Sequence, residues 1–158
     1  KAITGDFTLI SSTLSPAISL FIDVSDKGET GGIYEFKVHV ILMRISKSAY
    51  QTSSDTDSIY QLAFDAQFFL VSIHPFADGN GRISRLLMNY ILSYHQLPLA
   101  TIFKEDKLEY YQALEASCPQ DDEEPDLCPI RDFMSAQQMK YLSMEIKKYK
   151  QAEKKGGG

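Results

Sequence analysis

The feature that most restricts the fold is an apolar stripe that begins after Asp57 and stops at Pro75. Its apolar residues recur every three or four positions, which predicts the inner face of a buried helix. Asp57 is the expected N-cap, because a short acidic side chain accepts hydrogen bonds from the first helical N–H groups. Pro75 ends the helix, because a proline disfavours helical geometry in the residue before it. The members of the stripe are Ile59, Leu62, Ala63, Ala66, Phe69, Leu70 and Ile73.

Three later segments also have helical periodicity. One helix is expected to start near Arg82, to present an apolar face between Ile83 and Tyr94, and to close at Leu97 and Pro98. A third covers Glu105 to Ala116. A fourth carries Pro129 in its first turn, where the missing N–H of proline has no helical partner to lose. Its Tyr and Met stripe is expected to be core, with Phe133, Ala136, Met139, Leu142, Ile146 and Tyr149 at helical spacing.

The N-terminal part suggests a small β element. Apolar and polar residues alternate from Tyr34 to Val40, which is a strand pattern, and Gly31 and Gly32 precede them. The same stretch also fits a helical stripe that ends at Ile45, so a helix towards Met43 and Arg44 stays open. We expect a mainly α fold, a helical bundle with a small β-hairpin near the N-terminus. The domains are then 1–50 with the hairpin, 51–155 as the core, and a disordered tail at 156–158.

Composition and charge exclude several classes of protein. The chain has 158 residues, which suits one domain, and its net charge of −5 argues against broad binding to nucleic acid. No apolar run is long enough to cross a bilayer. The acidic residues from Asp121 to Asp126 and the excess of lysine in 140–155 are expected to be solvated surface. Cys118 and Cys128 are expected to be free thiols, with a single bridge as the alternative.

The loop between the first two helices carries the chemistry. Gly79 and Gly81 flank Asn80, so the backbone can take positive φ angles and approach a ligand closely. Backbone N–H groups at the following helix start lack internal partners and lie at the positive end of the helix dipole, which suits an anion. Arg82 and Arg85 are three residues apart and project on one face. Their guanidiniums oppose the dipole, and a bound polyphosphate would account for that conflict.

Two more residues complete a candidate reaction site. Asp78 could hold the magnesium ion that accompanies a polyphosphate. His74 precedes the loop and is the natural proton acceptor at neutral pH. An EF-hand calcium loop is excluded, because Phe76 and Leu87 would occupy positions that must supply oxygen. A merely structural glycine turn is the remaining alternative, but it leaves the concentration of charged residues unexplained.

The segment His74 to Arg85 resembles the signature of the Fic family, His-Pro-Phe-x-Asp/Glu-Gly-Asn-Gly-Arg-x-x-Arg, at every defined position. The resemblance extends over roughly residues 57–150, where helices like those around the Fic loop are expected. It implies a mainly α-helical protein adenylyltransferase, which transfers AMP from ATP to a Ser, Thr or Tyr hydroxyl of a target protein.

The same resemblance implies roles for the loop residues. His74 would be the general base and Asp78 the Mg²⁺ ligand, while Phe76 would anchor the loop in the core. Gly79 is the residue expected in the AMP-transferring majority of the family. The expected phosphate contacts come from Gly79, Asn80, Gly81 and the neighbouring amides for the α- and β-phosphates, Arg82 for the β-phosphate side, and Arg85 for the γ-phosphate.

Partners and control follow from the resemblance as well. The family's inhibitory helix has Ser or Thr four residues before Glu, whereas Ser143 is followed there by Lys147. Inhibition is therefore expected from a separate inhibitor or antitoxin, or from a segment outside this sequence. We expect no nucleic-acid or membrane partner and a cytoplasmic, bacterial location, with secretion into a host left open. The alternatives are a nucleotide-binding module or partner-silenced toxin without turnover, or transfer of another phosphate-containing group. The oligomeric state is not predicted.

Overall fold

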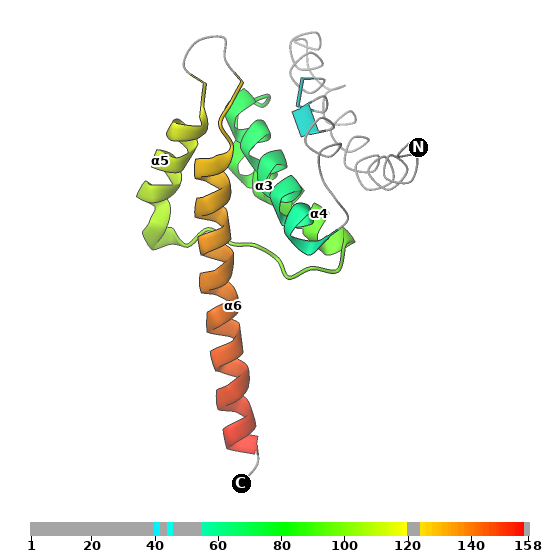
Figure 1. Ribbon diagram of the computed structural model, residues 1–158, viewed down its shortest axis with the longest axis vertical. Coiled ribbons are helices and arrows are strands. Elements are labelled where there is room, and N and C mark those ends of the chain that lie inside the picture. Colours follow the sequence, from blue (N-terminus) through cyan, green and yellow to red (C-terminus); the bar gives the residue numbers. More distant parts are fainter. Residues whose placement is uncertain (1–39, 42–43, 46–54, 120–123, 157–158) are drawn as a thin grey trace. The chain divides into compact units, whose positions relative to one another are not determined.

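The computed structural model describes residues 40–41, 44–45, 55–119 and 124–156. Every regular element in these residues is helical, and none of them forms a strand, so the expectation of a mainly α fold is confirmed. The chain divides into two compact units, Lys1–Leu99 and Ala100–Gly158. The first contains α3 (Thr56–Ile73) and α4 (Asn80–Tyr94). The second contains the 3₁₀ turn η1 (Lys104–Asp106), α5 (Lys107–Ser117) and α6 (Cys128–Gly156), as Figure 1 shows.

Asp55, rather than Asp57, caps the start of α3. The Asp55 Oδ1 accepts a hydrogen bond of 2.9 Å from the Ser58 N–H, and its Oδ2 accepts one of 3.0 Å from the Ser58 hydroxyl. Asp57 lies in the first turn instead, where its charge interacts favourably with the positive end of the helix dipole. The N-cap expected at Asp57 was therefore wrong by two residues. An N-cap carboxylate reaches the N–H group three positions later, and Asp55 stands in that relation to Ser58.

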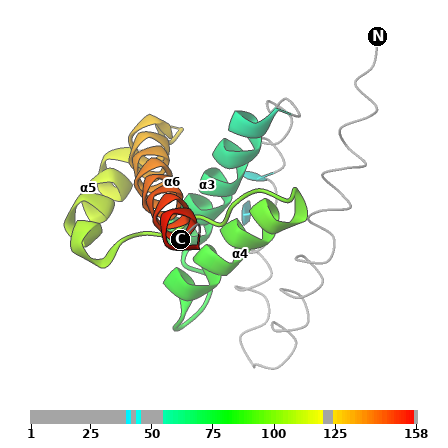
Figure 2. The same ribbon diagram turned by 90° about the horizontal axis from the view of Figure 1, so that it is seen from below.

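The middle of α3 is buried on all sides. All nine residues from Leu62 to Leu70 are buried, which is more than the single stripe expected from the sequence. One wall of this environment is α4, which lies beside α3 in both views (Figure 1 and Figure 2). The buried apolar residues of α4 are Leu87, Met88, Ile91 and Leu92. The two helices thus form a packed hairpin that holds the connecting loop between fixed ends.

The far end of α4 closes in a Schellman turn. Gln96 has a left-handed backbone with φ of 57°. Its N–H bonds to the Ser93 carbonyl at 3.0 Å, and the Leu97 N–H bonds to the Leu92 carbonyl at 2.9 Å. The Tyr60 hydroxyl then donates to the Pro98 carbonyl at 3.2 Å, which joins the exit of α4 to the start of α3.

The end of the N-terminal stretch that the sequence left open between strand and helix is helical. Val40, Ile41, Arg44 and Ile45 have helical backbone. Ile41 and Ile45 are both buried and lie four residues apart, which is the helical reading of this stretch rather than the alternating one. At Val40, the end of the alternating stretch, the helical alternative therefore holds. The remainder of the expected hairpin lies outside the described residues.

In the second unit α5 packs against the first half of α6. The rings of Tyr110 and Phe133 lie 5.8 Å apart between centroids. The start of α6 is capped by two hydrogen bonds: the Cys128 N–H donates to Asp126 Oδ1 at 3.0 Å, and the Ile130 N–H donates to the buried Ser117 hydroxyl at 3.1 Å. The helix expected over residues 105–116 is present, except that its first residues form the 3₁₀ turn η1.

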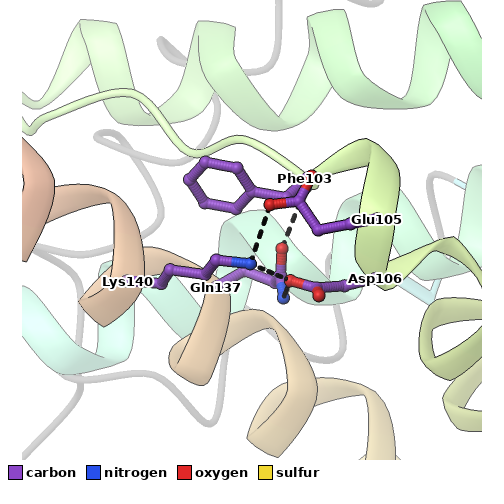
Figure 3. A network of polar contacts seen from close by, with 5 residues as sticks. All are labelled: Phe103, Glu105, Asp106, Gln137 and Lys140. Atoms are coloured by element: carbon purple, nitrogen blue, oxygen red, sulfur yellow. Dashed lines mark hydrogen bonds and ion pairs between the residues drawn. The ribbon is translucent and has the colours of Figure 1, made fainter.

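A polar network centred on Lys140 joins η1 to α6 (Figure 3). The Lys140 ammonium lies 2.6 Å from Asp106 Oδ2 and 3.1 Å from Glu105 Oε1. Gln137 donates to the same Asp106 oxygen at 2.8 Å and accepts from the Phe103 N–H at 2.9 Å. The hydrogen bond from Lys140 holds the pKa of the Asp106 carboxyl below its usual value, and Asp106 in turn raises the pKa of Lys140.

The exposed face of α6 from Met139 onward contradicts one expectation. Ile130 and Met134 are buried near the start of α6, but Met139, Ile146 and Tyr149 are 64%, 53% and 73% exposed. The stripe expected to be core therefore forms an exposed face. The reason is length, because α5 has 11 residues and α6 has 29, so α5 cannot cover the whole of α6.

The two cysteines and the C-terminal end of α6 belong to the second unit. Cys118 and Cys128 are both exposed free thiols, as expected. Gly156 belongs to α6, although residues 156–158 were expected to form a disordered tail. Among the described helices, none combines the length and the hydropathy that crossing a membrane requires.

Candidate active site

His74 turns the chain out of α3 with a left-handed backbone. Its φ and ψ are 54° and 61°, and its N–H still bonds to the Leu70 carbonyl at 3.1 Å. A non-glycine residue in this region is uncommon, and such conformations concentrate at functional sites. Pro75 follows and is buried, so the turn is fixed directly against the core. The backbone therefore presents the exposed His74 ring at the entrance of the loop.

The imidazole of His74 is oriented by the backbone of its own helix. Its Nδ1 lies 3.3 Å from the Val71 carbonyl oxygen. A carbonyl can only accept, so this contact is a hydrogen bond when Nδ1 carries the proton. In the neutral ring Nε2 is then the basic nitrogen, which is the tautomer that a general base requires. No pattern of side chains indicates this contact, because the acceptor is a main-chain atom.

Asn80 closes the loop from inside. Its Oδ1 accepts from the Phe76 N–H at 3.0 Å, and its Nδ2 donates to the Phe76 carbonyl at 2.6 Å. The side chain is only 2% exposed. Because this amide is committed to the backbone of Phe76, any phosphate contact made by Asn80 falls to its backbone N–H. The ring of Phe76 is half-buried.

The start of α4 leaves two N–H groups available. Gly79 has φ of 82° and precedes the helix, and no described side chain caps this end. The N–H groups of Arg82 and Ile83 both bond to the Gly79 carbonyl at 2.9 Å. The N–H groups of Asn80 and Gly81 are then the unsatisfied donors of the first turn. The sequence had suggested a helix start near Arg82. In the structure α4 begins two residues earlier, at Asn80.

Two guanidinium groups lie over this glycine-containing turn. A methyl group added to Gly79 would be 3.6 Å from Arg82 Nη2, and one added to Gly81 would be 3.7 Å from Arg85 Nη1. Arg82 also pairs with Asp78 at 3.3 Å, with both side chains largely exposed at 74% and 93%. An ion pair this exposed contributes little stability, so a ligand can displace it at small cost.

Ser84 supports the turn from behind and was not singled out from the sequence. It is buried, and its hydroxyl donates to the Gly81 carbonyl at 3.1 Å. The three-residue spacing on a helix start is the only signal that could have indicated this contact.

The donor set suits magnesium bound together with phosphate. In the described part of the chain, no cluster of three or more His, Cys, Asp or Glu side chains could hold a metal ion by itself. Mg²⁺ normally takes one or two carboxylates and completes its coordination with phosphate oxygens and water. Asp78 offers one exposed carboxylate beside the helix start, so the residues fit this mode and do not fit an all-protein metal cage.

Comparison with known proteins identifies the family of this segment. Residues 31–92 match the model of the Fic/DOC family, which includes α3, the loop and most of α4. This chain carries a Fic/DOC-family segment. The site described above therefore occupies the place of the family signature that residues 74–85 resemble.

Several relatives share one name, Protein adenylyltransferase Fic. The relative from Nematostella vectensis is 44% identical over 64 residues, which is 39% of this chain and 15% of that protein. That from Aedes aegypti is 41% identical over 70 residues, covering 44% of this chain and 13% of the relative. That from Drosophila melanogaster is 34% identical over 96 residues, covering 61% and 18%. The Fic segment here thus spans less than a fifth of each of these relatives.

Proposed function

We propose that this Fic segment transfers AMP from ATP to a Ser, Thr or Tyr hydroxyl of a protein. One observation carries the proposal: the loop between α3 and α4 gathers a histidine base, a carboxylate and two arginines at an uncapped helix start. The relatives named as protein adenylyltransferases support the choice of AMP as the transferred group.

Phosphate binding rests on the start of α4. The N–H groups of Asn80 and Gly81 point out of the first turn, and anions bind such ends through N–H donors and the helix dipole. Arg82 and Arg85 add forked donors to the same place. We assign the α- and β-phosphates to the loop amides, with Gly79 keeping the approach open, and the outer phosphates to the two guanidiniums.

Asp78 would hold Mg²⁺ in the complex with ATP, and the ion would neutralise charge on the phosphate oxygens. In the structure the Asp78 carboxylate pairs with Arg82 at 3.3 Å. We infer that nucleotide binding separates this pair, since Arg82 then turns to phosphate. The exchange replaces one weak surface ion pair by charge-assisted hydrogen bonds.

The chemical step assigns His74 to the acceptor. His74 Nε2 takes the proton of the protein hydroxyl while the hydroxyl oxygen attacks the α-phosphorus. The bond between the α-phosphorus and the bridging oxygen breaks, and pyrophosphate leaves with the bond's electron pair. The products are the protein–AMP phosphodiester, pyrophosphate and a protonated His74, which releases its proton to solvent. A positioned base contributes about 10²–10⁴-fold to such a step.

The decisive experiment compares α-labelled with γ-labelled ATP in the presence of Mg²⁺. The expected result is transfer of the α label to the protein itself or to proteins of a lysate, and no transfer of the γ label. His74→Ala should abolish the transfer. His95→Ala is the matched control, because His95 lies at the opposite end of α4 and should leave transfer unchanged.

Other outcomes lead to the alternatives. Transfer of the γ label would mean kinase chemistry at this loop. Retention of nucleotide without any transfer would favour a binding module, or an enzyme that a separate inhibitor protein silences. Transfer that survives His74→Ala would remove the assignment of the base.

A further inference from the structure

From Met139 onward, α6 presents an apolar face that nothing in its own compact unit covers. Met139, Ile146 and Tyr149 are more than half exposed, and Leu142 between them is partly exposed. In Figure 1 α6 continues well beyond the end of α5. An exposed row of large apolar side chains usually marks an interaction site.

The spacing of this row is that of a coiled-coil seam. The four residues follow one another by three, four and three positions, which is the a/d pattern of two heptads. Ridges with this spacing pack against an identical helix as knobs into holes. We call these four residues, Met139, Leu142, Ile146 and Tyr149, the α6 seam.

The α6 seam faces away from α5. Phe133 contacts Tyr110 of α5, and Leu142 follows Phe133 by nine residues. Nine residues amount to about two and a half turns at 3.6 residues per turn, so the two side chains lie on opposite sides of the helix. Another helix could therefore reach the seam without displacing α5.

We propose that the α6 seam binds the same seam of a second copy of this chain, with the two helices parallel. The charges beside the seam support this choice of partner. Glu145 and Lys150 occupy the flanking g and e positions of adjacent heptads. A parallel pair places Glu145 of each copy opposite Lys150 of the other, which gives two attractive pairs across the interface. An antiparallel pair in the same register places the two copies of Glu145 side by side, where they repel each other.

The contact is short, so the association is weak and depends on concentration. Ser135 and Glu153 occupy the next seam positions on either side, and both are polar. Each copy thus contributes four apolar residues, fewer than the three or four heptads of a self-sufficient coiled coil. The interface belongs with the small, transient class.

Sedimentation equilibrium of the whole chain over a range of concentrations tests the proposal. The apparent mass should rise towards twice the monomer mass. Ile146→Glu should remove that rise, because it places a charge in the seam of both copies. Met144→Glu is the matched control: Met144 is also apolar and 42% exposed on α6, but it lies outside the seam, so the rise should persist.

Charge exchange tests the orientation. Glu145→Lys alone and Lys150→Glu alone should each weaken the dimer by about tenfold or more, and the double variant should restore it, since parallel pairing re-forms both ion pairs. A double variant that stays as weak as the singles would overturn the parallel arrangement.

A mass that stays monomeric at every concentration, or an equal loss in Ile146→Glu and Met144→Glu, would overturn the dimer. The dimer would also be overturned if the chain stayed monomeric but bound phosphatidylserine vesicles, and Ile146→Glu abolished that binding. The seam would then bind a membrane surface. None of these variants touches the loop at residues 74–85, so the result is independent of the proposed AMP transfer.

Discussion

At the residue scale, the two glycines of the loop have different structural roles. Gly79 needs its left-handed backbone, with φ of 82°, to start α4. Gly81 lies inside the helix, and an added methyl group there would meet only Arg85 Nη1, at 3.7 Å. The absence of a side chain at Gly81 therefore has no structural reason in the described part of the chain, and a close ligand would supply one.

This contrast gives a prediction about Gly81→Ala. Alanine favours a helix over glycine by up to about 1 kcal/mol, so the variant should unfold at the same or a higher temperature. Its ATP affinity should fall by about tenfold or more, since the methyl group blocks approach to the N–H groups. Gly79→Ala should instead destabilise the fold, because left-handed backbone costs a non-glycine residue about 1–2 kcal/mol. Thermal unfolding and calorimetric ATP titration measure both effects, and unchanged ATP affinity in Gly81→Ala would contradict the phosphate assignment.

Asn80 is the second residue whose role can be isolated. Asn80→Ala should remove the two hydrogen bonds that this amide makes with the part-buried N–H and carbonyl of Phe76. Each unsatisfied group costs about 1–3 kcal/mol. We expect a loss of stability of that order in urea unfolding, whereas Ser93→Ala on the exposed face of the same helix should change it by less than about 0.5 kcal/mol. Equal effects of the two changes would mean that the loop does not depend on this amide.

At the element scale, the stability of the second unit depends on pH through the contact of η1 with α6. The hydrogen bond from Lys140 lowers the pKa of the Asp106 carboxyl in the folded chain. On acidification the unfolded chain therefore takes up this proton first. The contribution of Asp106 to folding is complete above about pH 4, the ordinary pKa range of Asp, and is lost as the pH falls through the lower, folded pKa.

Lys140→Gln should reduce this dependence. The difference in the free energy of unfolding between neutral pH and about pH 3 should shrink, because the hydrogen bond that lowers the Asp106 pKa is missing. Lys148→Gln is the control on the same helix, since Lys148 pairs with Glu145 one turn away, at 2.6 Å, and not with Asp106. Urea unfolding at the two pH values measures the difference. A pH dependence that is the same in Lys140→Gln as in the unchanged chain would show that Asp106 does not control it.

At the scale of the whole molecule, ligand binding and folding are linked. A ligand that binds only the folded chain stabilises it, by about 2.7 kcal/mol when present at 100 times its Kd. Arg82 and Arg85 lie three residues apart on α4 and reach the same turn, and we assign them to different phosphates. Nucleotides that differ by one phosphate therefore distinguish them.

Arg85→Ala should reduce the rise in melting temperature that Mg²⁺ and ATP cause more than the rise that Mg²⁺ and ADP cause. Arg82→Ala should reduce both by similar amounts, because ATP and ADP share the β-phosphate. Differential scanning fluorimetry with each nucleotide gives the comparison. Equal losses for ATP and ADP in Arg85→Ala would argue against its contact with the γ-phosphate.

The sequence by itself determined the helices of the described part and the residues of the candidate site. Periodicity located α3, α4 and α6, because an apolar row every three or four residues is a local signal. The match of residues 31–92 to the Fic/DOC family is likewise a property of the sequence, since the signature at His74–Arg85 is continuous. Boundaries were less well determined: Asp55 and Asp57 are equally suitable N-caps by composition.

Only the tertiary structure decided which partner each side chain has. The Asn80 side-chain amide is hydrogen-bonded to the backbone of Phe76, and His74 Nδ1 lies at the Val71 carbonyl. The left-handed backbone of His74, which no local pattern specifies, turns the chain between these two contacts. The same limit explains the α6 seam, since an apolar stripe shows that a helix face requires a partner but not whether the partner lies in the same chain. Burial is a property of the assembled elements, and α5 is too short to cover all of α6.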